Sequence, residues 1–213
     1  MNFLHLLCLL FVLTSCAEKG GSGGGHSKPN SDNPRSEEHT DSDTNTDFPH
    51  IKVEAKLIDM NSQEREEKLK KAIKLLEEVL NSNDFKERVS IFTYNGLNEF
   101  KLNNSLSNDE ILSGIHDGAE DLKPEIDNTA NLELTFYYTS SSTVGYTTTS
   151  VMLINLNTRF FDQYDLAHVA GNLAHEWMHK LGYRHASRNN STRIYTVPYG
   201  VGYLVRDIGE ELQ

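Results

Sequence analysis

Cysteine is almost absent from this sequence. The 213-residue chain has two cysteines, Cys8 and Cys16, and both lie near its amino-terminal end. If the segment before Cys16 is a cleaved leader, the rest of the chain has no thiol for a disulfide or for a cysteine-ligated metal. The same absence excludes a cysteine that holds a catalytic metal in a latent form.

An excess of positive charge is also missing. The chain has 20 Lys and Arg against 31 Asp and Glu, a formal net charge of -11. Nucleic acids and anionic membranes are bound through clustered Lys and Arg, so we expect no nucleic-acid partner. With 37% hydrophobic residues, the length suits one folded domain with extensions.

Long hydrophobic runs are lacking as well. The run from Phe3 to Leu13 is too short to span a bilayer but suits the core of a signal peptide. It ends in Leu13-Thr14-Ser15-Cys16, which resembles a bacterial lipobox and implies cleavage before a lipidated Cys16. We therefore expect an extracytoplasmic, membrane-anchored lipoprotein. The leader has no Lys or Arg, so a secreted protein with a plain signal peptide is the alternative.

The composition divides the chain into three parts. Residues 1–15 are the predicted lipoprotein signal peptide, and residues 16–47 hold the lipidated cysteine and a tether rich in Gly, Ser and Asp. The tether has almost no apolar residues and is expected to be disordered, with His26 and His39 solvated. Residues 48–213 form the predicted folded domain.

The first half of that domain alternates strand and helix patterns. We expect a strand at 51–58, an amphipathic helix at 61–82 capped by Asn61, and a strand at 89–96 that ends in an Asn-Gly turn. A short helix at 107–116 is predicted by a capping box of Ser107 and Glu110. His116 at its end is expected on the surface.

The second half begins with a stretch rich in β-branched and aromatic residues, 132–156. Within it, Val151 to Leu156 resembles a buried strand, and Thr143 to Thr149 resembles a sheet edge. A last, long helix is predicted from an Asp165 cap to Leu181, stopped by Gly182. These patterns indicate an α+β (mixed α/β) domain.

That last helix carries the chemistry. His175 and His179 are four residues apart, so both rings project from one face and can reach one ion. Glu176 is turned by about 100° from His175 and can face a metal-bound water instead of the metal. Gly182 tolerates positive φ, which lets the chain turn and bring His185 to the same ion.

The complete pattern H-E-x-x-H-x-x-G-x-x-H resembles the metzincin clan of zinc endopeptidases. The resemblance implies a zincin domain with a twisted mixed sheet, a long active-site helix and a small C-terminal subdomain. It implies Zn²⁺ held by His175, His179 and His185, and Glu176 as general base in peptide-bond hydrolysis. It also implies a polypeptide substrate added as an antiparallel strand at the sheet edge, which we assign to Thr143 to Ser150, although an ordinary edge is equally consistent.

The chain departs from the clan at the Met-turn, because no methionine follows Met178. Aligning the clan's S-x-M-x-Y with 195–199 puts Val197 in the place of the methionine and Tyr199 in the place of the tyrosine. Tyr199 is then a candidate metal ligand or oxyanion donor, with a structural role as the alternative. The short tail predicts an open, shallow cleft.

Other titratable residues have simpler interpretations. His168 lies seven residues before His175, roughly 10 Å along the helix, too far for the same ion, so we expect it to pack or to hydrogen-bond inside the domain. His50 has no evident partner. Trp177 and Met178 are expected in the core or the cleft wall.

Two alternatives stay open. A gluzincin-like site would take Glu210 or Glu211 as third ligand, although these residues lie at the end of the chain. A catalytically silent, zinc-containing binding or scaffold lipoprotein would keep the metal without turnover. Glu176 favours catalysis over that reading, because a structural zinc site needs no carboxylate beside a water.

Overall fold

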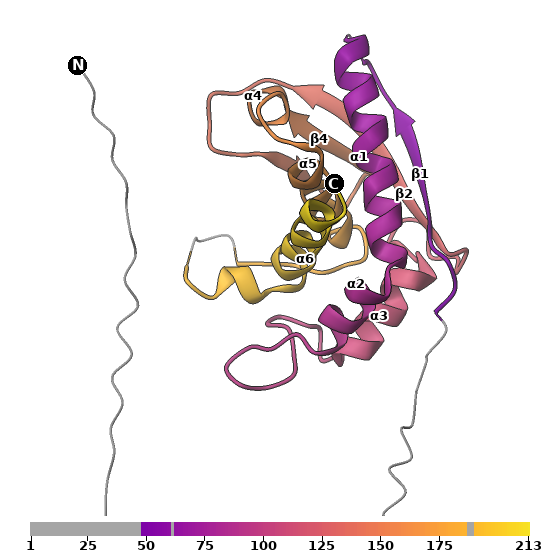
Figure 1. Ribbon diagram of the computed structural model, residues 1–213, viewed down its shortest axis with the longest axis vertical. Coiled ribbons are helices and arrows are strands. Elements are labelled where there is room, and N and C mark those ends of the chain that lie inside the picture. Colours follow the sequence, from indigo (N-terminus) through magenta and orange to yellow (C-terminus); the bar gives the residue numbers. More distant parts are fainter. Residues whose placement is uncertain (1–47, 61, 187–189) are drawn as a thin grey trace, which may run out of the picture. The chain divides into compact units, whose positions relative to one another are not determined.

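The computed structural model describes residues 48–60, 62–186 and 190–213 (Figure 1). The predicted leader, Cys16, His26 and His39 lie outside these ranges. Within them, no helix has the length and apolar character needed to cross a bilayer. The architecture is mixed α/β, with a four-stranded mixed sheet and six α-helices among the described residues.

The sheet has the strand order β1-β2-β4-β3. β1 (Lys52–Leu57), β2 (Thr129–Tyr137) and β4 (Leu153–Asn157) run parallel, whereas β3 (Gly145–Thr147) is antiparallel to β4 and lies at the edge. The predictions of a first strand at 51–58 and of an edge within 143–149 are thus confirmed. The predicted buried strand begins later, because Val151 is 48% exposed and precedes β4 in a turn.

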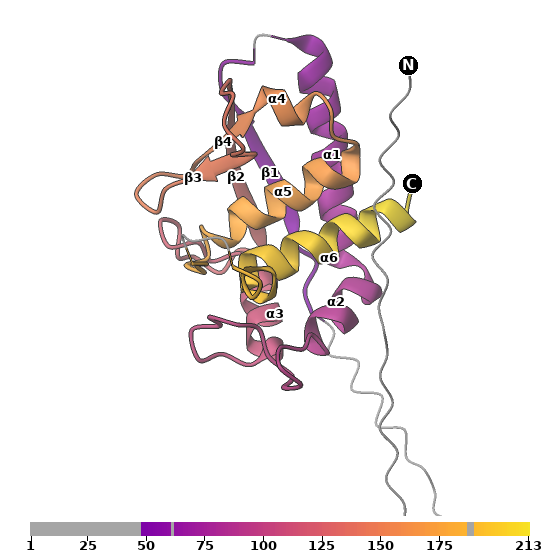
Figure 2. The ribbon, with the colours of Figure 1, turned by 90° about the vertical axis from the view of Figure 1, so that its left-hand side faces the viewer.

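Three helices pack over one face of this sheet. α1 (Gln63–Asn81) and α5 (Leu166–Met178) lie against it, and α6 (Val197–Glu211) runs beside α5 (Figure 2). Along β2 the buried residues alternate, with Ala130, Leu132 and Leu134 contributing to the core. The alternation follows from the two-residue period of a strand, which turns every second side chain towards the helices. Charged residues such as Lys52 and Glu54 of β1 are exposed.

Two local predictions in the first half are wrong. The cap of α1 is Ser62, whose side chain accepts a hydrogen bond from the Arg65 amide; Asn61, the predicted cap, lies outside the described residues. The predicted strand at 89–96 starts inside a helix instead, because α2 covers Asn83–Ser90. The apolar residues Phe85 and Val89 of α2 are four apart and both fully buried, so helical spacing prevails over the β propensity of this segment.

The predicted capping box is confirmed at α3 (Asn108–Asp117), where Ser107 and Glu110 bond reciprocally. The surface role of His116 is wrong, since the residue is fully buried. Its Nδ1 donates to the Pro49 carbonyl at 2.9 Å, and its ring stacks on Phe48. The segment entering β1 covers this helix end, a long-range contact that the local pattern does not report.

The chain after His185 also differs from the prediction. Instead of ending with the helix that carries the histidines, it forms a 3-10 turn (Arg193–Tyr195) and then α6, which packs along α5 within the main core. No separate C-terminal subdomain is formed by the described residues. The sequence pattern did not predict this helix because it contains Pro198, Gly200 and Gly202. Proline is tolerated in a first helical turn, where its missing amide is not needed.

Glycine at the α5–α6 crossing lets the two backbones approach closely. A Cβ on Gly202 would lie 2.9 Å from the Gly171 carbonyl oxygen and 3.2 Å from Cβ of His175. This crossing sets the depth of the site between the helices.

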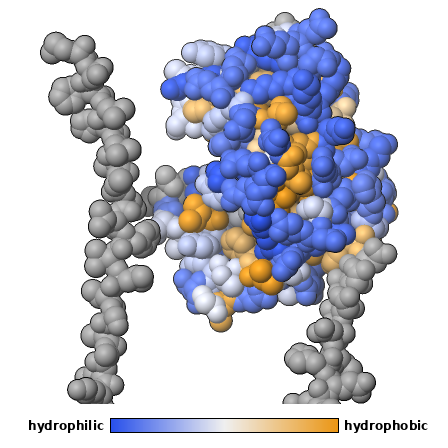
Figure 3. Space-filling model, in the orientation of Figure 1, coloured by the Kyte–Doolittle hydropathy of each residue, from blue (hydrophilic) through white to orange (hydrophobic). Residues whose placement is uncertain are grey.

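A short helix, α4 (Thr158–Phe161), links β4 to α5. The face drawn in Figure 3 is mainly hydrophilic, with a smaller hydrophobic zone near its centre.

Candidate metal centre

The helix α5 is positioned at both ends. Asp165 caps its start by accepting from the His168 amide at 2.8 Å, as predicted. Trp177 is fully buried on its core side, and its Nε1 donates to the buried carboxylate of Glu120 at 2.9 Å. Met178 is fully buried as well, so both residues lie in the core as predicted.

The end of α5 forms a tight reversal at Gly182. Regular helix ends at Met178, earlier than predicted, but the Leu181 amide still bonds back to the Trp177 carbonyl at 3.2 Å. The Gly182 amide then donates to the His179 carbonyl and the Tyr183 amide to the Met178 carbonyl, with Gly182 at φ +83°. This is a Schellman motif, and it returns the chain towards the helix face.

The reversal brings the three predicted histidines together. One ring nitrogen each of His175, His179 and His185 lies within 4.8 Å of the others. The ring centroids are 5.2 Å apart for His175–His179, 5.2 Å for His175–His185 and 4.8 Å for His179–His185. That spacing places three nitrogen donors around one point.

Hydrogen bonds orient two of these rings. Nδ1 of His179 donates to the Tyr183 carbonyl at 2.8 Å, and Nδ1 of His185 donates to the Ala186 carbonyl at 3.2 Å. A carbonyl can only accept, so Nδ1 of His179 carries the proton and its Nε2 keeps its lone pair. Such an outer hydrogen bond is typical of metal-binding histidine.

Burial also keeps the rings neutral. It lowers the pKa of His175 well below its usual value and that of His179 to about 4, and it lowers the pKa of His185 as well; mutual repulsion adds to the first two shifts. Neutral imidazole is the form that binds a metal. The donor set, its spacing and its protonation therefore fit a Zn²⁺ ion with an open fourth position.

Glu176, next to His175 on α5, lies against the edge strand. Its side chain is buried, and a Cβ built on Gly145 of β3 would be 3.3 Å from Oε1. Burial raises the pKa of this carboxyl to about 7, and the charge of Lys180 opposes the rise. A divalent cation beside the carboxyl would favour its charged form further. The carboxylate is thus placed where both a metal site and the edge strand are within reach.

Lys180 is a residue that the sequence reasoning missed. It is 2% exposed, and its Nζ donates to the carbonyls of Thr148, at 2.9 Å, and Val151. These carbonyls belong to the turn between β3 and β4. Lys180 therefore ties the edge strand to the histidine helix. The available signal was a lysine between His179 and the apolar Leu181, just after the end of α5.

Tyr199 lies beside the histidines, in the first turn of α6. Its ring centroid is 4.4 Å from that of His175 and 5.0 Å from that of His185, and burial raises the pKa of its hydroxyl. Val197, in the place of the Met-turn methionine, is fully buried. Tyr199, which the alignment on 195–199 matches to the clan's tyrosine, thus lies at the site. It lies on a helix rather than in a loop.

Comparisons of the chain with models of known protein families, with curated proteins and with solved structures find no match. The interpretation of the site rests on its own residues.

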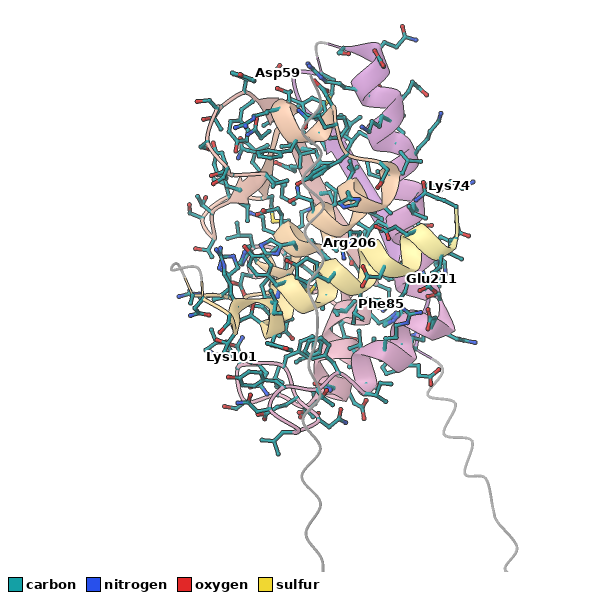
Figure 4. All side chains as sticks on the ribbon, turned by 60° about the vertical axis from the view of Figure 1, so that its left-hand side comes forward. Asp59, Lys74, Phe85, Lys101, Arg206 and Glu211 are labelled. Atoms are coloured by element: carbon teal, nitrogen blue, oxygen red, sulfur yellow. The ribbon has the colours of Figure 1, made fainter. Side chains whose placement is uncertain are left out.

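The gluzincin-like alternative is not supported by the positions of its glutamates. Glu211 lies at the end of α6 (Figure 4) and accepts from Arg88 at 2.9 Å. Glu210 lies 3.7 Å from His168. Neither joins the three histidines in the described part of the chain. His168 is partly exposed rather than internal, and its Nδ1 lies 2.9 Å from the Asp165 carboxylate. His50 lies 3.7 Å from Glu77.

A cavity of about 390 Å³ opens beside His175. Its walls are α5, α6 and the segment 142–144 that enters β3. The last of these is held by Asn157, whose side-chain amide donates to the carbonyls of Thr139 and Thr143. Of the three histidines, His175 is the one that lines this cavity. Arg193, from the 3-10 turn, was also missed by sequence reasoning and lines the same cavity.

Proposed function

We propose that this protein is a zinc-dependent endopeptidase of the metzincin type. The observation that carries the proposal is the gathering of three neutral histidine donors within 4.8 Å, with a buried carboxylate on the adjacent residue of the same helix. A purely structural zinc site has four protein ligands and no use for such a carboxylate.

His175, His179 and His185 would hold the zinc. When bound, zinc supplies Lewis-acid polarisation of a substrate carbonyl and lowers the pKa of water. The Glu176 carboxylate accepts the proton of the attacking water and delivers it to the leaving amine nitrogen. Its buried position strengthens that role, because a desolvated carboxylate is a stronger base than a solvated one.

The edge strand supports a polypeptide substrate. β3 pairs with β4 on one side only, so its outer backbone groups can pair with an extended chain. Such a chain would pass Glu176, which lies next to Gly145. In this scheme the Tyr199 hydroxyl donates a hydrogen bond to the oxyanion of the tetrahedral intermediate.

The location proposed for the enzyme is the cell envelope or cell surface, with Cys16 lipidated and residues 16–47 acting as a tether. The support is the lipobox-like sequence and the composition of the tether. Replacement of Cys16 by Ser should abolish incorporation of labelled palmitate and release the protein from membranes. Unchanged membrane association of Cys16→Ser would contradict lipid anchoring.

The test of the function is the zinc content and proteolytic activity of the purified protein and of Glu176→Gln. We expect about one zinc per chain in both proteins, and cleavage of an unfolded protein substrate by the parent alone. The loss in Glu176→Gln should be at least 100-fold, the range expected for a general base. Zinc in both proteins with cleavage by neither would instead support a silent binding or scaffold protein.

A further inference from the structure

We infer that the cavity beside His175 binds a carboxylate of the substrate and that Arg193 is the residue that selects it. This inference deepens the proposed function and rests on it. The carboxylate can come from an acidic side chain or from a free C-terminus, which offer the same chemistry.

The charge of the cavity is opposite to that of the chain. The protein carries a net charge of -11, yet none of the described residues that line the cavity is Asp or Glu. Its ionisable lining consists of His168, His175, Arg193 and Arg206, together with three tyrosines. A concave site lined by an arginine without a carboxylate partner and by no acidic side chain attracts an anionic group and disfavours a cationic one.

The two arginines are not equivalent. Arg206 is neutralised, because its guanidinium donates to Asp207 at 2.6 Å and lies 3.6 Å from Glu210. In Figure 4 this residue comes from the middle of α6. Arg193 has no carboxylate within 4.0 Å among the described residues, and its buried Nε has no hydrogen-bond partner there. A guanidinium has five donors, and an unpaired buried donor is costly. Within the described ranges, Arg193 is therefore the cavity arginine without an anionic partner.

Contacts hold Arg193 in place at the metal centre. Its guanidinium carbon lies 4.7 Å from the Tyr199 ring centroid, and its NH2 group lies 3.2 Å from Nδ1 and 3.4 Å from Nε2 of His185. The tyrosine ring contacts the face of the guanidinium and leaves the N–H edge for ligands. When His185 gives a ring-nitrogen lone pair to a metal, that lone pair is no longer available to the NH2 group. A substrate carboxylate would then meet both donors of a preoriented fork.

This arrangement predicts selectivity at one position close to the cleaved bond. The probes are N-acetylated, C-amidated peptides that differ at a single scanned position, with Glu, Gln or Lys there. A fourth peptide has no acidic side chain and a free C-terminus. The proteins are the full chain, Arg193→Gln, Arg193→Lys and, as matched control, Arg184→Gln; Arg184 is exposed and does not line the cavity. All are assayed saturated with zinc.

For the parent we expect kcat/KM for one Glu peptide to exceed that of its Gln counterpart by about tenfold or more, with Lys lowest, because a charge-assisted hydrogen bond is stronger than a neutral one. The ratio should fall to about one in Arg193→Gln, recover partly in Arg193→Lys and stay unchanged in Arg184→Gln. A preference for the free C-terminus with the same dependence would identify the carboxylate as terminal. Equal cleavage of all four peptides, or a preference that survives Arg193→Gln, would overturn the inference.

A binding measurement separates this inference from the proposed function. Affinities of the Glu and Gln peptides are measured by fluorescence anisotropy on Glu176→Gln, with and without Arg193→Gln. Cleavage by the parent without selectivity refutes the role of Arg193 and leaves the protease standing. Arg193-dependent preference in binding, with no cleavage by the parent, supports the carboxylate site and rejects the protease.

Discussion

Glu120 offers the sharpest test of how the histidine helix is held. The residue is fully buried, and its Oε1 accepts from the Asn131 amide at 2.7 Å and from Trp177 Nε1 at 2.9 Å. Its Oε2 accepts from Asn131 Nδ2 at 3.1 Å. The carboxylate therefore joins β2 to the segment of α5 that lies between His175 and His179.

The loss in free energy of unfolding on removal of Glu120 follows from these hydrogen bonds. Glu120→Ala leaves the backbone amide of Asn131 and Nε1 of Trp177 without an acceptor, whereas Nδ2 of Asn131 keeps the Thr129 carbonyl. A hydrogen bond to a charged group is worth about 1.5–3 kcal/mol, so losing two should lower the free energy of unfolding by about 3–6 kcal/mol. A domain of this size should then melt roughly 6–24 °C lower. Glu120→Gln keeps an oxygen at the Oε1 position and should lose only about 1–2 kcal/mol.

Urea unfolding followed by tryptophan fluorescence measures these losses, because Trp177 is the only tryptophan and lies at the bond itself. Glu125→Ala is the matched control, since Glu125 is exposed nearby and its removal should change stability by less than about 0.5 kcal/mol. If Glu120→Ala and Glu125→Ala unfold at the same urea concentration, the carboxylate does not support α5 and the reasoning fails.

Three further predictions concern the interior. His116→Phe should make the free energy of unfolding depend less on pH below pH 6.5. Burial lowers the pKa of His116 below its usual value of 6.5, so the stability contributed by neutral His116 is complete above pH 6.5 and is lost as pH falls towards the folded pKa. Urea titrations from pH 7.5 to 5 measure the slope, and an identical slope would contradict the reasoning. Gly202→Ala should cost about 1–3 kcal/mol and weaken zinc binding, because its Cβ would meet Gly171 O at 2.9 Å, whereas Gly114→Ala should be tolerated. Lys180→Met should raise the KM for peptides and speed amide exchange in β3, as both its carbonyl partners lose their donor; unchanged exchange would exclude a tethering role.

Most of the correct predictions from the sequence concern features with local determinants. The capping box of Ser107 and Glu110, the Asp165 cap and the reversal at Gly182 each depend on residues within a few positions of one another. The spacing of His175 and His179 needs only the helical period. Wrong predictions arose where local preference and burial disagree, as at Val89, whose β-branched side chain is buried on α2.

The sequence by itself thus determined the three histidines, the adjacent glutamate and the turn that joins them, because eleven consecutive residues contain the whole pattern. Tertiary structure alone decided what surrounds them. The cavity forms where α6 crosses α5, Lys180 meets carbonyls 29 and 32 residues away, and Arg193 reaches the site from a separate turn. Contacts between distant segments depend on how buried faces pack together, and no local spacing encodes that packing.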